Sequence, residues 1–311
     1  HDAMSFESYT DFGDWPMSSG FTVDWTHGNI PGKPVWLTVE GLQDAAAQCA
    51  DAIYALARGA EGIGIPMREP GAARTNQRRI RIGRFLERYG PLATAFEPDR
   101  SVAVLFNELQ TRTLYHCHAL HSHLMRLGYA PVVLSEKTVE ETGVPDGTKI
   151  VLIPNLRLPF SAECEEGLAR FRKGGGRVVV VGKDTLPLEG AVTLDVSLKQ
   201  LWDIGGFTAR VEFWDEFRKV RPGLEKLMAG ILPPRNGAAP EKALVIPMDA
   251  GGVRYVAVIS SPLDHPDTEF HPVEDVPVRV ANAVRVVNLV TGETLKAEGG
   301  EVRVDLVPEP A

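Results

Sequence analysis

The sequence has few cysteines and no long apolar run. Its 311 residues include three cysteines, Cys49, Cys117 and Cys164. They are too few and too scattered to indicate a disulfide framework or a structural zinc site. No apolar run approaches the roughly 18 residues that a membrane-spanning helix needs, so we expect no membrane partner. A reducing compartment fits this cysteine usage, and we expect a cytoplasmic location.

Excess positive charge is also missing. The formal net charge is −8 and the pI is near 5.6. Because binding to nucleic-acid phosphates needs clustered positive charge, this balance argues against a nucleic-acid partner. One basic cluster, between Arg74 and Arg88, alternates with apolar residues at helical spacing, which predicts a solvated helix face. With 44% hydrophobic and 24% charged residues, the chain is an ordinary globular protein, long enough for two or three domains.

One apolar stretch ends on a carboxylate. Residues 33–40 (KPVWLTVE) read as a strand that stops at Glu40, and Gly41 follows at once. Barrel enzymes place catalytic acids at the carboxyl ends of parallel strands, where the side chain can point into a pocket. A second strand pattern follows at residues 60–66, and the alanine-rich segment 44–58 between them predicts a helix. This is a β-α-β unit with Glu40 at the end of its first strand.

The chain begins within a strand pattern, residues 1–9, without a leader or an initiating methionine. We therefore expect the sequence to be the C-terminal portion of a longer protein, with earlier barrel strands preceding His1. The alternative is an unusual three-strand α/β start.

Two further units follow. Apolar strands at residues 100–106, 128–134, 148–154 and 174–182 alternate with predicted helices, which indicates a flavodoxin-like parallel sheet covered on both faces. An amphipathic helix is predicted at residues 213–232. From about residue 240 the apolar period becomes two, typical of a small antiparallel sandwich. We expect domains at residues 1–97, 98–239 and 240–311.

The order of these motifs resembles a known family. The run at residues 149–154, the helix after it and the run at residues 174–180 are similar to the class I glutamine-amidotransferase-like domain of family 42 glycoside hydrolases, the β-galactosidases. Residues 2–9, 33–40 and 59–68 resemble that family's sixth, seventh and eighth barrel strands. The resemblance implies an α/β fold that contains the last three strands of a (β/α)8 barrel. It also implies a carbohydrate substrate, no cofactor, and a trimer assembled through the flavodoxin-like domain at residues 98–239, called the layered domain below.

The resemblance also implies site residues. Glu40 would be the catalytic nucleophile, and Tyr9 would orient it by a hydrogen bond. The family's eighth strand ends in an aromatic residue and an arginine; this chain has Met67 and Arg68, so Arg68 is a substrate-binding candidate and the sugar stays open.

A retaining glycosidase holds two carboxyl groups about 5–5.5 Å apart. Glu40 supplies one, and the family's acid/base would lie on the fourth strand, before His1. Glu7 lies two residues before Tyr9 on the same strand face. We interpret Glu7 as a sugar-contacting or ion-paired residue, with an acid/base role as the alternative.

Aromatic residues are frequent in the first 40 positions. We place most of them in a long loop after the first strand, where Trp15 and Trp25 are candidates for a sugar-stacking wall. The alternative is that the aromatics pack under this loop. The set is Phe12, Trp15, Phe21, Trp25 and Trp36.

Two other constellations have chemical potential. Four histidines between His116 and His123 have helical spacings that a transition metal could use, but no carboxylate lies close in sequence, and we favour an interdomain surface over a metal site. An active amidotransferase needs a cysteine at a strand-to-helix elbow. Here the strands end in Asn155 and Lys183, and Cys164 falls in a predicted helix, so we expect a catalytically silent domain.

The resemblance thus implies a retaining glycoside hydrolase for β-galactosides or related glycosides, without the acid/base in this sequence. The alternative from another class is a non-catalytic carbohydrate-binding or assembly protein, in which Glu40 is only a polar strand end.

Overall fold

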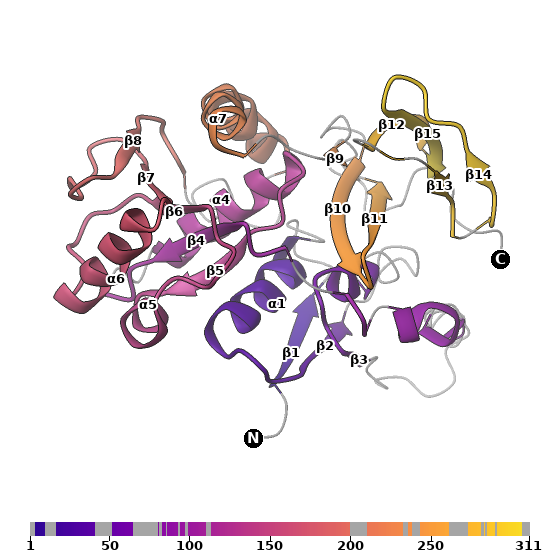
Figure 1. Ribbon diagram of the computed structural model, residues 1–311, viewed down its shortest axis with the longest axis horizontal. Coiled ribbons are helices and arrows are strands. Elements are labelled where there is room, and N and C mark those ends of the chain that lie inside the picture. Colours follow the sequence, from indigo (N-terminus) through magenta and orange to yellow (C-terminus); the bar gives the residue numbers. More distant parts are fainter. Residues whose placement is uncertain are drawn as a thin grey trace.

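The chain folds into two parallel sheets and several small antiparallel sheets (Figure 1). The computed structural model describes residues 4–9, 17–40, 52–64, 80, 83–84, 86–92, 94–96, 99–109, 113–199, 210–232, 236–237, 243–260, 273–280, 283, 285–289 and 291–306. The mixed α/β class that the sequence predicts is confirmed. None of the described helices combines the length and the apolar character that crossing a membrane requires.

The first parallel sheet is formed by β1 (Met4–Tyr9), β2 (Val35–Glu40) and β3 (Gly62–Gly64), in that order. Helix α1 (Met17–Asn29) connects β1 to β2, and residues 52–57 are helical before β3. Val35 and Leu37 are fully buried against both helices. The predicted β-α-β unit is therefore confirmed where the chain is described; residues 44–51 of the predicted helix lie outside that part.

The long loop predicted after β1 is wrong for residues 17–29, which form α1. The apolar period of this helix is interrupted by Gly20, Asp24 and Gly28, which hid it in the sequence. Each interruption has a tertiary cause. A Cβ on Gly20 would lie 1.6 Å from the Tyr54 ring, and one on Gly28 would lie 2.1 Å from the Val133 carbonyl oxygen, so close packing requires glycine at both positions. Asp24 is buried in an ion pair.

The second parallel sheet has the strand order β5-β4-β6-β7-β8. Numbered along the chain this is the order 2-1-3-4-5 of flavodoxin-like sheets, as predicted. Its strands are β4 (Val102–Phe106), β5 (Val132–Ser135), β6 (Ile150–Pro154), β7 (Arg177–Val181) and β8 (Val192–Leu194).

Helices cover both faces of this sheet. One apolar core joins it to α4 (Thr113–Arg126) and α7 (Arg210–Ile231), and a second joins it to α5 (Glu136–Thr142) and α6 (Ala162–Lys173). The sequence predicts a helix at residues 161–173 with Ser161 as its cap. Helix α6 begins there, and the Ser161 hydroxyl accepts a hydrogen bond from the Cys164 amide, 3.2 Å away.

The C-terminal region is antiparallel, as predicted. The hairpin of β10 (Ala243–Ala250) and β11 (Val253–Ser260) turns at Gly251 and Gly252, whose φ angles are +57° and +77°. Strand β12 (Val273–Val280) pairs with β15 (Glu301–Leu306) and β9 (Asn236–Gly237), and β13 (Val286–Val287) pairs with β14 (Thr294–Leu295).

Strand β10 is buried on both faces. Its Leu244 and Ile246 pack with Tyr54 and Met125, while Val245 on the other face packs against the valines of β12 and β15. The hairpin thus lies between the helices and the C-terminal sheets.

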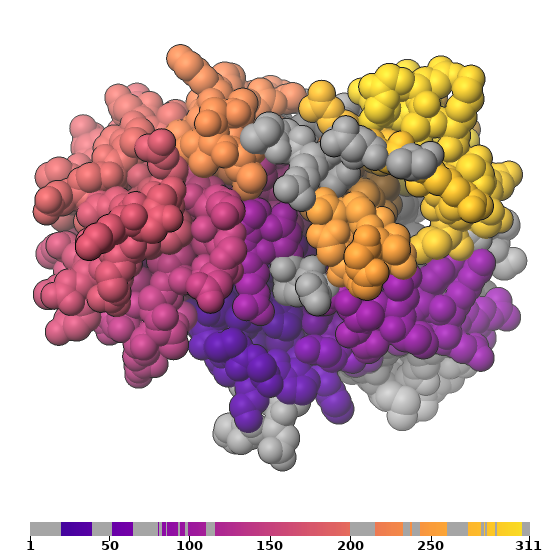
Figure 2. All heavy atoms as spheres, in the orientation of Figure 1, coloured from indigo at the N-terminus to yellow at the C-terminus, as the bar shows by residue number. Residues whose placement is uncertain are grey.

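The predicted basic helix face also has an observed partner. Arg84 and Arg88 are exposed on a helical segment, as the spacing predicts. Arg88 Nη2 and the Tyr89 hydroxyl donate to the Leu289 carbonyl oxygen at 3.4 and 2.9 Å. Figure 2 shows the yellow C-terminal atoms directly against this purple segment.

Candidate functional site

The carboxyl ends of β1 and β2 bring two predicted site residues together. In the parallel register Tyr9 is the partner of Glu40, and Glu7 is the partner of Thr38. Partners in neighbouring strands are about 4.8 Å apart and share one face of the sheet. The backbone therefore places Tyr9 and Glu40 at adjacent positions on one face. The roles of their side chains stay a prediction.

This face differs from the one that packs on the helices. Val35 and Leu37 point into the apolar core, so Trp36, Thr38 and Glu40 occupy the opposite face of β2. Trp36 is 55% exposed there. The alternation of apolar and other residues along β2 signals this division in the sequence, and with it the place of Trp36 on the same face as Glu40.

Strand β3 fits closely beside these residues because of two glycines. A Cβ on Gly62 would lie 2.9 Å from the Trp36 ring, and one on Gly64 would lie 2.7 Å from the Thr38 hydroxyl oxygen. The β2 side chains thus occupy the space that larger residues on β3 would fill. This leaves a polar and aromatic strip running along β2 toward Glu40.

Of the remaining candidates the structure describes Trp25, and it does not lie on this face. Trp25 lies on α1, half-buried, and packs against the core of the five-stranded sheet. The loop on which its proposed sugar-stacking role depended is absent, because the segment is helical. Trp25 therefore belongs to the packing between the two sheets, the alternative given above. Trp15 and Arg68 lie outside the described residues.

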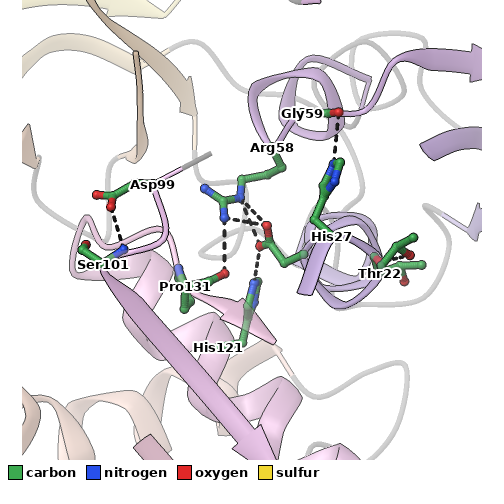
Figure 3. Close-up of polar contacts among 10 residues, drawn as sticks. Thr22, His27, Arg58, Gly59, Asp99, Ser101, His121 and Pro131 are labelled. Carbon is green, nitrogen blue, oxygen red and sulfur yellow. Dashed lines mark hydrogen bonds and ion pairs between the residues drawn. The ribbon is translucent and has the colours of Figure 1, made fainter. Parts of the chain in front are cut away.

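A buried polar network lies where α1 meets the layered domain (Figure 3). Asp24 of α1 accepts hydrogen bonds from Arg58 Nε at 2.8 Å and Nη2 at 2.5 Å, and its second oxygen lies 2.7 Å from His121 Nε2 of α4. Arg58 also donates to the Pro131 carbonyl oxygen at 3.2 Å. All three side chains are almost fully excluded from solvent. Sequence reasoning missed this network, because its partners are separated by 34 and 97 positions.

Two of the four histidines of α4, His118 and His121, line this interface, in line with the favoured interpretation. The rings of His118 and His121 contact Phe21 of α1 at centroid distances of 4.7 and 5.4 Å. His116 instead contacts the Asn155 side chain, and His123 packs on Phe217 of α7. The four imidazoles are thus divided among three neighbours, Phe21, Asn155 and Phe217. In the part of the chain that the structure describes, no three histidine, cysteine, aspartate or glutamate side chains are grouped so as to hold a metal ion.

Burial sets the charge states in this region. Burial lowers the pKa of His121 below its usual value, and the hydrogen bond and charge of Asp24 oppose this effect. Burial also lowers the pKa of His123 to about 3, with a further contribution from Arg126. For Arg58, burial lowers the pKa, but Asp24 outweighs it and the pKa is raised. The network is therefore an Arg⁺–Asp⁻ pair with a neutral histidine.

The carboxyl ends of the second sheet lack an amidotransferase nucleophile at the described positions. Asn155 follows β6 with φ of +47°, and its side-chain nitrogen lies 3.0 Å from His116 Nε2. Cys164 lies in the first turn of α6, as predicted, with its side chain in the apolar core. Burial raises the pKa of Cys164 to about 12, which disfavours the thiolate that nucleophilic attack requires.

Comparisons with known proteins give the fold a context. No protein-family model and no curated protein matches the sequence. Several solved structures are similar to this chain in fold. The β-galactosidase of Bacillus circulans sp. alkalophilus matches with a TM-score of 0.65 at 14% identity, over 98% of this chain and 60% of that enzyme.

Two other glycosidases match over the same share of this chain. α-L-Fucosidase isoenzyme 2 of Paenibacillus thiaminolyticus has a TM-score of 0.59 at 13% identity, and the rhamnosidase of Novosphingobium sp. PP1Y has 0.57 at 12%. The chain spans 63% and 33% of their lengths. At these identities the likeness concerns the fold. The chain has the fold of a portion of these glycosidases, as the resemblance drawn from the order of its motifs implies.

Proposed function

We propose that this chain carries the nucleophile side of a retaining glycoside hydrolase site, with Glu40 as the nucleophile and Tyr9 as the residue that orients it. The pairing of Tyr9 with Glu40 at the carboxyl ends of two parallel strands supports this proposal most directly. Their face of the sheet is opposite to the one that packs on α1 and on residues 52–57, so we infer that a substrate approaches from this side.

The chemistry requires a second carboxyl group. The nucleophile attacks the anomeric carbon while the other carboxyl group first protonates the leaving oxygen and then activates water. Glu7 is two residues before Tyr9, about 6.6 Å further from the strand end. That position favours contact with the sugar or with a charged partner over proton transfer at the scissile bond. We therefore propose that the acid/base comes from barrel strands outside this sequence.

The substrate class is proposed more broadly than one sugar. Structures of a galactosidase, a fucosidase and a rhamnosidase all share the fold, so the fold does not select a sugar. The motif resemblance favours β-galactosides, while Met67 in place of an aromatic residue favours a related glycoside. The rival function is carbohydrate binding or assembly without catalysis.

Replacing Glu40 by glutamine separates these functions. The measurement uses the protein with its complete barrel and an aryl β-galactoside, alongside aryl fucosides and rhamnosides. Glutamine keeps the shape but removes the attacking charge, so turnover should fall by about three or more orders of magnitude while the folded state survives.

The matched control is Glu61→Gln, at the opposite end of the same sheet. The Glu61 carboxylate accepts a hydrogen bond from the Val35 amide at 2.7 Å, which a glutamine oxygen can also accept. This variant should keep turnover within about a factor of two. If Glu40→Gln keeps more than about a tenth of wild-type turnover, Glu40 is a strand end and the non-catalytic function is favoured.

A second experiment tests whether Glu40 forms a covalent bond with the anomeric carbon. In Glu40→Gly the space of the carboxylate is free, so added azide should restore part of the turnover. The product should be a glycosyl azide of inverted configuration, detectable by NMR. The Glu61→Gly variant should show no increase in turnover when azide is added.

A further inference from the structure

Helix α1 connects the two strands of the candidate site and also packs against the layered domain. It leads from the strand that ends at Tyr9 to the strand that ends at Glu40. Its other side lies against the layered domain, where Phe21 packs in that domain's core and Asn29 bonds to β5. Any shift of α1 relative to the layered domain is therefore transmitted to both strands of the candidate site.

The buried network ties two connections to one carboxylate. Asp24 belongs to α1, which precedes β2, and Arg58 closes the helical segment that follows β2. Both hold the same carboxylate, and His121 reaches that carboxylate from α4 of the layered domain. We propose that His121, acting through Asp24 and Arg58, is a positioning residue for strand β2 and so for Glu40; its catalytic consequence rests on the proposed function.

Hydrogen bonds from Arg58 and His121 fix the orientation of the Asp24 carboxylate. Oδ1 of Asp24 receives Arg58 Nε and Nη2, and Oδ2 receives His121 Nε2 with a longer contact to Arg58 Nε at 3.0 Å. Every oxygen has a fixed donor, so the carboxylate cannot rotate without losing a bond. A buried ion pair contributes little net stability compared with apolar packing of the same volume, but it specifies one arrangement. This supports a role in positioning.

The link contains a titratable group. His121 Nδ1 is buried and, among the described residues, has no hydrogen-bond partner. Protonation of His121 would place an N–H there and add a cation beside Arg58. The groups that face the pair are Asp24 on α1, Arg58, and His118 on α4, with Tyr54 and Asp99 close to Arg58. Asp24 alone opposes the added charge directly, and it is already shared with Arg58.

The sign of the pH dependence follows from the lowered pKa of His121. The undocked or unfolded chain has a histidine of ordinary pKa, about 6.5, and binds the proton more readily than the docked state. Docking is therefore at full strength above pH 6.5 and weakens as the pH falls below it. Each pH unit between the two pKa values multiplies the open population about tenfold.

Hydrogen exchange of the 311-residue chain tests this without any activity. Between pH 7.5 and 5, after correction for intrinsic exchange, amides of α1 and β2 should lose protection relative to those of α6 and β7, by up to about tenfold for each pH unit below 6.5. His121→Gln keeps a donor to Asp24 but does not titrate, so this differential loss should disappear. His123→Gln, a buried histidine on the same helix that packs on α7, should retain it.

Two results would overturn the proposal. One is equal protection of α1 and β2 at both pH values in the wild-type chain, a measurement that does not depend on any variant folding. The other is the same pH dependence in His121→Gln as in the wild type.

The complete-barrel protein supplies the catalytic readout. There, His121→Gln should lower kcat more than it raises KM and should remove an acid loss of kcat/KM that sets in below pH 6.5. An unchanged pH profile contradicts the positioning role. Failure of the proposed function is recognised separately, because Glu40→Gln would then leave turnover intact whatever the exchange of α1 shows.

Discussion

At the scale of single residues, Asn29 replaces a piece of β-strand. Its Nδ2 donates to the Val133 carbonyl oxygen at 2.9 Å, and its Oδ1 accepts from the Ser135 amide at 2.6 Å. A neighbouring parallel strand would bond to the same two groups of β5, so the side-chain amide closes the edge of the sheet.

Removing this amide should destabilise the chain. In Asn29→Ala the Val133 carbonyl and the Ser135 amide lose their partners in a buried region, which should cost about 2–4 kcal/mol of unfolding free energy. Urea unfolding measures this cost. Asn288→Ala, in an exposed turn where Asn288 accepts from the Thr291 amide, should cost less than about 1 kcal/mol. Equal losses in the two variants would show that the edge is not held by Asn29.

Residues whose partners are local were accessible from the sequence. The Ser161 cap and the place of Cys164 within α6 depend on neighbours three positions away, and Glu40 was identified from the strand it ends. Asn29, Asp24 and His121 were not accessible, because their partners lie 34 to 106 positions away and no local period marks them.

At the scale of elements, α1 and the helical segment at residues 52–57 are held together by one buried ion pair. Asp24→Asn leaves the Arg58 guanidinium uncompensated in a dry environment, which should cost about 3–5 kcal/mol of unfolding free energy. Replacing both partners, as Asp24→Leu with Arg58→Met, removes both charges and should recover most of that stability. Chemical denaturation of the two variants and the wild type measures the difference. A double variant as unstable as Asp24→Asn would show that the loss comes from packing rather than from an unpaired charge.

The same helix shows why one element escaped prediction. Periodicity identifies a helix when its apolar face is continuous, and it worked for α6 and α7. In α1, glycine stands where the Tyr54 ring of the segment before β3 and the Val133 carbonyl of the layered domain approach, and aspartate stands where Arg58 and His121 converge. Tertiary contacts select these residues, so the local pattern reads as a loop. Trp25 was assigned to a sugar pocket for the same reason.

At the scale of the whole molecule, the order of elements was more informative than any one motif. The alternation of strands and helices predicted both parallel sheets, and the change to period two near residue 240 predicted the antiparallel region. The placement of β10 between the helices and the C-terminal sheets was not predictable, because a strand buried on both faces shows only a continuous apolar run.

The activity of the chain as it stands follows from this architecture. The face of β2 that carries Glu40 is open, with Trp36 55% exposed, and the described strands supply one carboxylate at the predicted site position. If the acid/base lies on barrel strands outside this sequence, as proposed, nothing protonates the leaving group, and the 311-residue chain should show no measurable turnover of aryl β-galactosides. Its open sheet edges should also make it self-associate, which light scattering can follow. Robust hydrolysis by this chain would mean that a second carboxyl group is already present, and loss of that hydrolysis in Glu7→Gln would then identify Glu7 as the acid/base.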